Sequence, residues 1–294
     1  MGGAGPFRLK HTPWYRVFKI MQSAKGAGSL AWLLALGVFA SQSLAGLPPI
    51  VEVPGLASSV LHATWDLTNQ SNPYQCPDIN TDTTHVIWTD ATCALPYARD
   101  CWRYEILTEY DYSRKSLRSR RGVNVTVPYW GLTNGIDNIG CIDPTHENWC
   151  LGLSKIFQGL NDHLRSAMNY TNTTLYGAPY DWRLVPDKTA MADYFRALQA
   201  LIESAYTRNG NTRVLTICHS LGCPLLAVFF STYVSDEWKQ THIVAHVNIA
   251  GAFGGATKAL RVALSGENFG VFTTANSFFQ ELQVPHRTPL PMCL

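Results

Sequence analysis

The residues with the clearest chemical potential are Cys218-His219-Ser220-Leu221-Gly222, which stand between an apolar run and a helix-like stretch. Val214–Ile217 predicts a buried strand, and Pro224–Phe230 predicts a helix whose first turn accommodates the proline. A serine on a sharp strand-to-helix turn presents its hydroxyl beside backbone N–H groups that bind an oxyanion. The pattern predicts a nucleophile elbow with Ser220 as the attacking group. Cys218 replaces the usual first glycine, so an ordinary strand, loop and helix with a surface serine stays the alternative.

We predict that a second backbone N–H donor for the oxyanion comes from a loop after residue 55. Residues 47–55 form a short apolar run that ends in Pro54-Gly55, a pattern typical of a buried strand followed by a turn. The small residues 57–59 come next and allow the backbone to approach a ligand closely. Hydrolases with a serine elbow place their second oxyanion N–H on such a loop. We therefore expect the backbone N–H groups of Leu56 and Leu221 to bind the oxyanion.

The elements around the elbow alternate between helix and strand. Apolar residues spaced three and four apart predict amphipathic helices over residues 152–168 and 187–206. The second helix leads into the strand before Ser220, and residues 243–250 supply the next strand. This alternation predicts an α/β fold with a mostly parallel sheet covered by helices on both faces.

A separate excursion, rich in apolar and aromatic residues, runs from Cys76 to Cys101. Such a loop predicts a lid, held at its base by a disulfide, whose apolar tip meets lipid. A plain surface subdomain explains the composition equally well.

The first 45 residues have the pattern of a secretory signal. Five basic residues and no acidic one occupy residues 1–25, and an apolar run of eleven, residues 30–40, follows. This run is too short to span a bilayer comfortably, and Ser43-Leu44-Ala45 offers small residues where signal peptidase needs them. We expect residues 1–45 to be a signal peptide that precedes the domain formed by residues 46–294. An uncleaved signal anchor in the endoplasmic reticulum membrane is the alternative.

Charge and glycosylation motifs agree with the secretory pathway. The chain has 23 basic and 21 acidic residues, and without residues 1–45 it has 18 basic and 21 acidic residues. A slightly acidic domain implies no cationic surface and gives no support to nucleic acid as a partner. Four sequons predict N-glycosylation, and they begin at Asn69, Asn124, Asn169 and Asn172.

All eight cysteines follow residue 45, and an oxidising compartment favours disulfides among them. Cys141 and Cys150 bracket a short polar loop and could close it. Cys218 and Cys223 flank Ser220, and we interpret them as buried free thiols that pack like small apolar side chains. The cysteine and histidine spacings do not support a zinc site, so we expect no metal and no other cofactor.

Residues 176–183, Tyr-Gly-Ala-Pro-Tyr-Asp-Trp-Arg, resemble the Gly-Ala-Pro-Tyr-Asp-Trp-Arg signature of the lecithin:cholesterol acyltransferase family. That family also includes lysosomal phospholipase A and phospholipid:diacylglycerol acyltransferase. Val53-Pro54-Gly55 resembles the family's oxyanion-loop strand, residues 219–222 resemble its nucleophile turn, and residues 250–255 resemble the glycine-rich strand exit. The resemblance covers about residues 47–270.

The resemblance implies an α/β-hydrolase fold that acts on glycerophospholipid at a membrane or lipoprotein surface. Ser220 would take the fatty acyl group, and water or a lipid alcohol such as a sterol or diacylglycerol would accept it. The protein would be secreted or lysosomal. Residues 76–101 resemble the family's disulfide-closed lid, which implies a bridge between Cys76 and Cys101, although Cys93 leaves the pairing open.

Within the signature, Asp181, Trp182 and Arg183 are candidates for polar or packing contacts near the substrate. The interpretation that we favour is structural. Asp181 and Arg183 would form a buried ion pair, with Trp182 and Tyr180 packed around it.

The sequence offers no clear general base for Ser220. On this fold the chain order is serine, acid, histidine. After Ser220 the acidic residues are Asp236, Glu237, Glu267 and Glu281, and the histidines are His242, His246 and His286. None of them makes a convincing pair, and His219 points elsewhere on the turn because it is the direct neighbour of the serine.

In the family the acid and the histidine lie farther along the chain. We therefore expect residues 46–294 to be a partial α/β-hydrolase domain that lacks the C-terminal part of the fold and has little or no activity. Two functions follow from the sequence. The first is a lipid O-acyltransferase or phospholipase A, and the second is a catalytically inactive lipid-binding or interaction protein.

Overall fold

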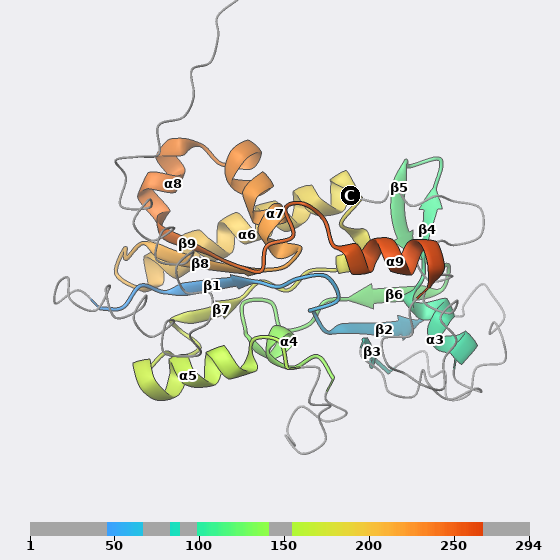
Figure 1. Ribbon diagram of the computed structural model, residues 1–294, viewed down its shortest axis with the longest axis horizontal. Helices are drawn as coiled ribbons and strands as arrows, with labels where there is room; N and C mark the ends of the chain where they lie inside the picture. Colours follow the sequence, from blue (N-terminus) through green and yellow to red (C-terminus); the bar gives the residue numbers. More distant parts are fainter. Residues whose placement is uncertain (1–45, 67–82, 89–98, 141–154, 267–294) are drawn as a thin grey trace, which may run out of the picture. The chain divides into compact units, whose positions relative to one another are not determined.

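The computed structural model describes residues 46–66, 83–88, 99–140 and 155–266 (Figure 1). The elements below belong to one compact unit that begins at Pro48. In chain order they are β1 (Ile50–Val53), β2 (Leu61–Trp65), β3 (His85–Trp88), α3 (Arg99–Ile106), β4 (Thr108–Asp111), β5 (Ser116–Ser119), β6 (Val123–Thr126), α4 (Asn134–Asp137), α5 (Gln158–Met168), β7 (Leu175–Gly177), a 3-10 turn (Trp182–Leu184), α6 (Lys188–Arg208), β8 (Val214–His219), α7 (Gly222–Val228), a π turn (Phe229–Tyr233), α8 (Asp236–His242), β9 (Ile243–Ile249) and α9 (Thr257–Ser265).

The main sheet is parallel and has the strand order β7-β1-β8-β9. β1 pairs with β7 on one side and with β8 on the other, and β9 pairs with the far side of β8. Val53 stands opposite Cys218, so the carboxyl ends of β1 and β8 lie side by side. The predicted parallel sheet is confirmed, and its register brings the loop after β1 next to the turn after β8.

Helices cover both faces of this sheet (Figure 1). On one face α6 and α7 pack against Val51 and Val214. On the other face Leu164 of α5 packs in a core with Ile50 and Ile217. Ile50 and Val51 belong to opposite cores because successive side chains of a strand point to opposite faces. The prediction of an α/β fold with helices on both faces is confirmed.

The helix bounds differ from the predictions where local contacts compete with the helix. α5 begins at Gln158 rather than at residue 152, because Lys155 pairs with Asn138 and the Ile156 N–H donates to the Asp137 carbonyl. α6 begins at Lys188 and extends to Arg208, two residues beyond the predicted end.

The helix after Ser220 also differs from its prediction. It begins at Gly222, earlier than the predicted residue 224, and its α-helical part ends at Val228. The chain continues as a π turn over Phe229–Tyr233. Among the described helices none is long and apolar enough to cross a membrane.

A second, antiparallel sheet has the order β3-β2-β6 and packs on α3. Its core contains Trp65 of β2, Ile87 of β3 and Trp102 of α3. The predicted lid, residues 76–101, is described at residues 83–88 and 99–101. These parts form β3 and the start of α3, so the described portion of the excursion is built into a sheet and a helix.

Candidate active site

Ser220 occupies a sharp turn between β8 and α7. Its φ angle is 50°, in the left-handed region that a residue with a side chain rarely adopts. The Ser220 N–H donates to the Ile249 carbonyl at 3.0 Å, and the Ser220 carbonyl accepts from the N–H groups of Cys223 at 3.1 Å and Ala252 at 3.2 Å. Contacts from both β9 and α7 thus hold the strained backbone in place, as a nucleophile elbow requires.

Two glycines permit the close packing around the elbow. A Cβ atom at Gly222 would overlap the carbonyl oxygens of Val53 and Pro54. A Cβ atom at Gly55 would lie 2.8 Å from the Ser220 Cβ, closer than real side chains approach one another. The absence of side chains at these positions lets the loop after β1 touch the elbow.

The predicted oxyanion donors lie on these two touching segments. Among the described residues no acceptor takes a hydrogen bond from the N–H of Leu56 or of Leu221. The loop turns sharply because Ala57 has a φ angle of 56°, and the Trp88 indole donates to the Ala57 carbonyl at 2.7 Å. β3 therefore fixes the oxyanion loop, a contact that the sequence did not reveal.

A general base for Ser220 does not occur among the described residues, where no side chain hydrogen-bonds to the Ser220 hydroxyl. The His219 ring packs edge-on against Phe157, and its Nδ1 is buried without a partner in the described part of the chain. Burial lowers the pKa of His219 below its ordinary value, which favours the neutral ring.

The histidines that follow the serine in the chain either hydrogen-bond to other groups or lie outside the described residues. His246 Nδ1 contacts the Thr216 hydroxyl at 3.0 Å, and its Nε2 contacts the Asn248 side chain at 2.7 Å. His242 Nδ1 contacts the Trp238 carbonyl at 2.9 Å. Asp236 and Glu237 start α8, whereas Glu267, Glu281 and His286 lie outside the described residues.

Cys218 and Cys223 form a disulfide across the elbow, so the interpretation as free thiols is wrong. Their Cα atoms are 5.0 Å apart, and both residues are fully buried. The sharp turn at Ser220 brings the end of β8 against the first turn of α7, and this places two residues five apart within bonding distance. The available signal was the pair of cysteines around the serine in an oxidising compartment.

The signature segment forms the buried ion pair that we favoured from the sequence. The Arg183 Nη2 lies 2.7 Å from the Asp181 Oδ2, and both side chains are largely buried. Arg183 also donates to the carbonyls of Glu105 and Ile106 and to the Ser119 hydroxyl, so it joins α3 and β5 to the signature. No functional contact to a substrate is needed to explain its position.

Tyr180 links the signature to the oxyanion loop. Its hydroxyl donates to the Pro54 carbonyl at 3.0 Å, and this carbonyl oxygen packs against Gly222 of the turn. Trp182 is partly buried and makes an edge-on contact with Trp88, whose indole fixes Ala57. The aromatic residues of the signature thereby support the loop that carries Leu56.

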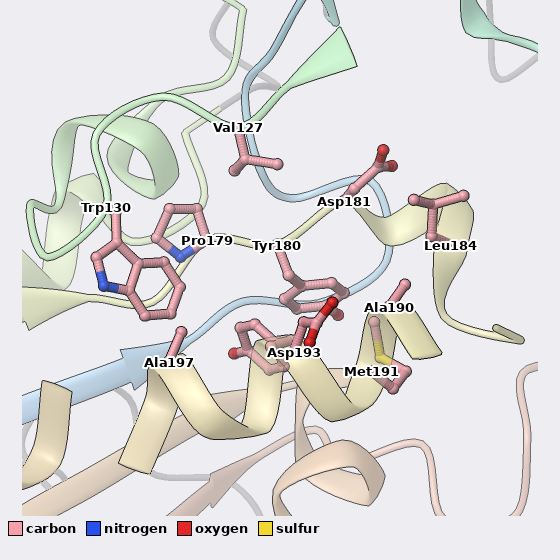
Figure 2. Close-up of a pocket in the computed structure, with 11 residues that line it drawn as sticks. Val127, Trp130, Pro179, Tyr180, Asp181, Leu184, Ala190, Met191, Asp193 and Ala197 are labelled. Carbon is pink, nitrogen blue, oxygen red and sulfur yellow. The ribbon is translucent and has the colours of Figure 1, made fainter. Parts of the chain in front are cut away.

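An apolar hollow of about 300 Å³ lies beside the signature (Figure 2). Figure 2 shows Trp130 at one end and Leu184 at the other, with α6 forming the floor through Met191 and Ala197. Tyr180 belongs to the wall, whereas Ser220 does not. The hollow is therefore distinct from the candidate catalytic serine.

A buried polar cluster between β1 and α5 was not anticipated from the sequence. Glu52 of β1 is fully buried, and its Oε2 accepts from the Asn161 side-chain amide at 2.8 Å. The same amide donates to Asp137 at 2.6 Å, and Arg165 contacts Asp137 at 3.5 Å. The signal was a single acidic residue inside an otherwise apolar strand.

The remaining predicted sites are described only in part. Cys101 is disulfide-bonded, whereas Cys76, Cys141 and Cys150 lie outside the described residues. The sequon asparagines Asn124, Asn169 and Asn172 are exposed, and Asn69 lies outside the description. Within the described ranges no group of three metal-ligating side chains could hold an ion.

Comparison with known proteins decides the family. The model of the lecithin:cholesterol acyltransferase family matches residues 83–287. The chain belongs to this family. It is 28% identical over 284 residues to a phosphatidylcholine-sterol acyltransferase of Mus musculus, which covers 94% of the chain and 60% of the relative.

Lysosomal relatives are similar to the chain to about the same extent. A lysosomal phospholipase A and acyltransferase of Rattus norvegicus is 32% identical over 221 residues, which is 75% of the chain and 50% of the relative. The Homo sapiens protein of the same name is 32% identical over 243 residues, which is 82% of the chain and 56% of the relative. The chain thus spans 50% to 60% of the length of these relatives.

Proposed function

We propose that this family member forms an acyl-serine at Ser220, with a fatty acyl group taken from a glycerophospholipid. The observation that carries the proposal is the left-handed Ser220 at the end of a parallel strand, packed against the loop after β1. Relatives named for phosphatidylcholine and for phospholipase A support a phospholipid as the acyl donor.

In this proposal the Ser220 Oγ attacks the carbonyl carbon of the lipid ester. The Leu56 and Leu221 N–H groups hold the oxyanion until the bond to the glycerol oxygen breaks and the lysolipid leaves with a proton. Water then releases a free fatty acid, or a lipid alcohol such as a sterol or diacylglycerol takes the acyl group as a new ester. Both outcomes are represented in the names of the relatives.

The setting that we propose is a membrane or lipoprotein surface reached through the secretory pathway. The signal-like residues 1–45 and the exposed sequon asparagines support it, and several relatives are named as lysosomal.

A base must accept the Ser220 proton, and it is not among the described residues. Elbow and oxyanion donors without a base retain only a small part of the rate enhancement of a complete triad. We therefore propose slow acylation by the residues that the structure describes. The same observation favours the second candidate function, a lipid-binding protein without turnover.

A fluorophosphonate probe tests the proposal, because it reacts with activated serines and mimics the acylation step. We expect one slow adduct, which peptide mapping places on Ser220, and no adduct in Ser220→Ala. Ser231→Ala is the matched control, since this exposed serine lies in the π turn after α7 and should not alter labelling. If the folded wild type gains no adduct at Ser220 after prolonged exposure, the acyl-serine is refuted and the lipid-binding function takes its place.

A further inference from the structure

The hairpin of β4 and β5, together with the two arginines that follow it, concentrates the positive charge of the domain. Residues 109–121 contain five basic residues and two acidic ones. The rest of residues 46–294 contains 13 basic and 19 acidic residues. The expectation of no cationic surface, drawn from the net charge, overlooked this segment, because a net charge averages over positions that the fold keeps apart.

Two cations at the turn of the hairpin have no acidic partner among the described residues. Arg118 is already paired, with Glu109 at 2.9 Å and with Asp111 at 3.6 Å. Arg114 and Lys115 lie in the connection between the strands, and both are exposed. Their charges are therefore available to a partner outside the chain.

The turn itself is shaped to present these two side chains. The Asp111 Oδ1 accepts from the Ser113 N–H at 2.9 Å, from the Ser113 hydroxyl at 2.6 Å and from the Arg114 N–H at 3.1 Å. These hydrogen bonds, with that from the Ser113 side chain foremost, lower the pKa of Asp111. Lys115 takes the left-handed conformation, with a φ angle of 53°, that leads back into β5.

An exposed aromatic pair stands beside the cations. The Tyr112 residue is 71% exposed, and its ring meets the Tyr110 ring edge-on at a centroid distance of 5.0 Å. Tyrosine is enriched where one end of a side chain enters the apolar edge of a bilayer and the other stays in water. An exposed tyrosine next to unpaired cations fits the headgroup layer of a membrane better than it fits bulk water.

β5 is fixed to the signature segment and to Asp187, the N-cap residue of α6. The Leu117 N–H donates to the Asp187 carboxylate at 2.7 Å, and the Arg183 Nη2 donates to the Ser119 hydroxyl at 3.1 Å. Arg183 is itself held by its ion pair with Asp181. β5 also lies near β6, as Figure 1 shows. A partner that binds the turn therefore binds an element that hydrogen bonds hold to the rest of the domain.

We propose that the turn of the β4–β5 hairpin docks the protein on an anionic phospholipid surface. Arg114 and Lys115 face the lipid phosphates and carboxylates, and Tyr112 enters the headgroup layer beside them. Each cation near such a surface strengthens binding about fivefold, so the pair strengthens it about thirtyfold. This inference shares the phospholipid surface with the proposed function, but it does not require Ser220 to react.

Vesicle binding tests the proposal directly. We would measure sedimentation of the purified chain with phosphatidylcholine vesicles that contain no anionic lipid or about 30% phosphatidylserine, a composition that sets the surface potential. Arg114→Ala/Lys115→Ala should bind the anionic vesicles about thirtyfold more weakly than the wild type. Arg208→Ala/Arg213→Ala is the matched control, since it removes the same charge from two exposed positions on another part of the surface and should bind as the wild type does.

A local measurement separates the hairpin from the basic residues near the chain start. Hydrogen exchange over residues 109–121 should slow when anionic vesicles are added, and it should not change with phosphatidylcholine alone. Ser220→Ala should show the same protection, so failure of the acyl-serine proposal would leave this result intact.

Three outcomes would overturn the docking proposal. The exchange of residues 109–121 could be insensitive to anionic vesicles, or the control variant could lose as much binding as the variant of the turn. The turn could also bind a soluble polyanion such as heparin or single-stranded DNA while it ignores anionic vesicles, which would assign this surface to a different class of partner.

Discussion

Glu52→Gln is the substitution whose effect the structure determines most closely. Glu52 is fully buried in β1, and among the described residues its Oε1 has no hydrogen-bond donor. Burial raises the pKa of Glu52 to about 8, and the neighbouring Asp137 carboxylate also raises it, against the opposing effects of Asn161 and Arg165. Glutamine keeps the shape, removes the charge and provides the donor that only the protonated acid provides.

The sign of the effect follows from the two protonation states. Below about pH 4.5 the carboxyl is protonated in both the folded and the unfolded chain, so it does not contribute to the pH dependence. Between about pH 4.5 and 8 the unfolded chain releases the proton and the folded chain keeps it. The free energy of unfolding therefore falls as the pH rises, by about 1.4 kcal/mol per pH unit.

The magnitude follows from the same interval. Relative to pH 4.5, the free energy of unfolding is lower by about 3 kcal/mol at pH 7, and above pH 8 the decrease levels off at about 5 kcal/mol. Because glutamine cannot ionise, Glu52→Gln should be more stable than the wild type by these amounts and should match it near pH 4.5.

Urea unfolding at several pH values between 4.5 and 8.5 measures this difference. Asp162→Asn is the matched control, since it removes an exposed carboxylate from the same helix as Asn161 and should give no comparable gain. A difference between Glu52→Gln and the wild type that stays constant across this pH range would refute the reasoning. A loss of stability in Glu52→Gln at pH 7 would refute it as well.

Two further substitutions test the elbow and the signature. Cys218→Ala/Cys223→Ala should lower the free energy of unfolding by about 2 kcal/mol, because the disulfide closes a short loop; alkylation of either cysteine in the denatured, unreduced wild type would contradict the bond. Arg183→Ala should lower it by about 3 to 5 kcal/mol, because it leaves the Asp181 carboxylate buried and unpaired. Urea unfolding measures both, and a loss below 1 kcal/mol for Arg183→Ala would show that the pair is not a structural contact.

The sequence predicted the elements of the main sheet from short-range patterns. The apolar runs before Pro54 and before Ser220 became adjacent parallel strands, and the three-and-four spacing over residues 187–206 became α6. Such patterns survive folding because they reflect the faces that each element must bury. The start of α5 was wrong because backbone pairing between Lys155 and Asn138 overrode the helical pattern.

The candidate site was predictable only where one segment contains the whole feature. Ser220 and Leu221 belong to a single turn, and the sequence suffices to propose their roles. The Trp88 contact to Ala57 and the Tyr180 contact to Pro54 join segments far apart in the chain, and neither has a local signal.

By itself the sequence determined the family signature, the elbow and the alternation of helix and strand. The tertiary structure decided that Cys218 and Cys223 bond to each other, that Glu52 is buried against Asn161 of α5, and that Arg114 and Lys115 are exposed in the hairpin turn. The physical reason is that burial, hydrogen bonding and charge pairing are properties of the space around a side chain. That space is formed by segments whose proximity only the folded chain establishes.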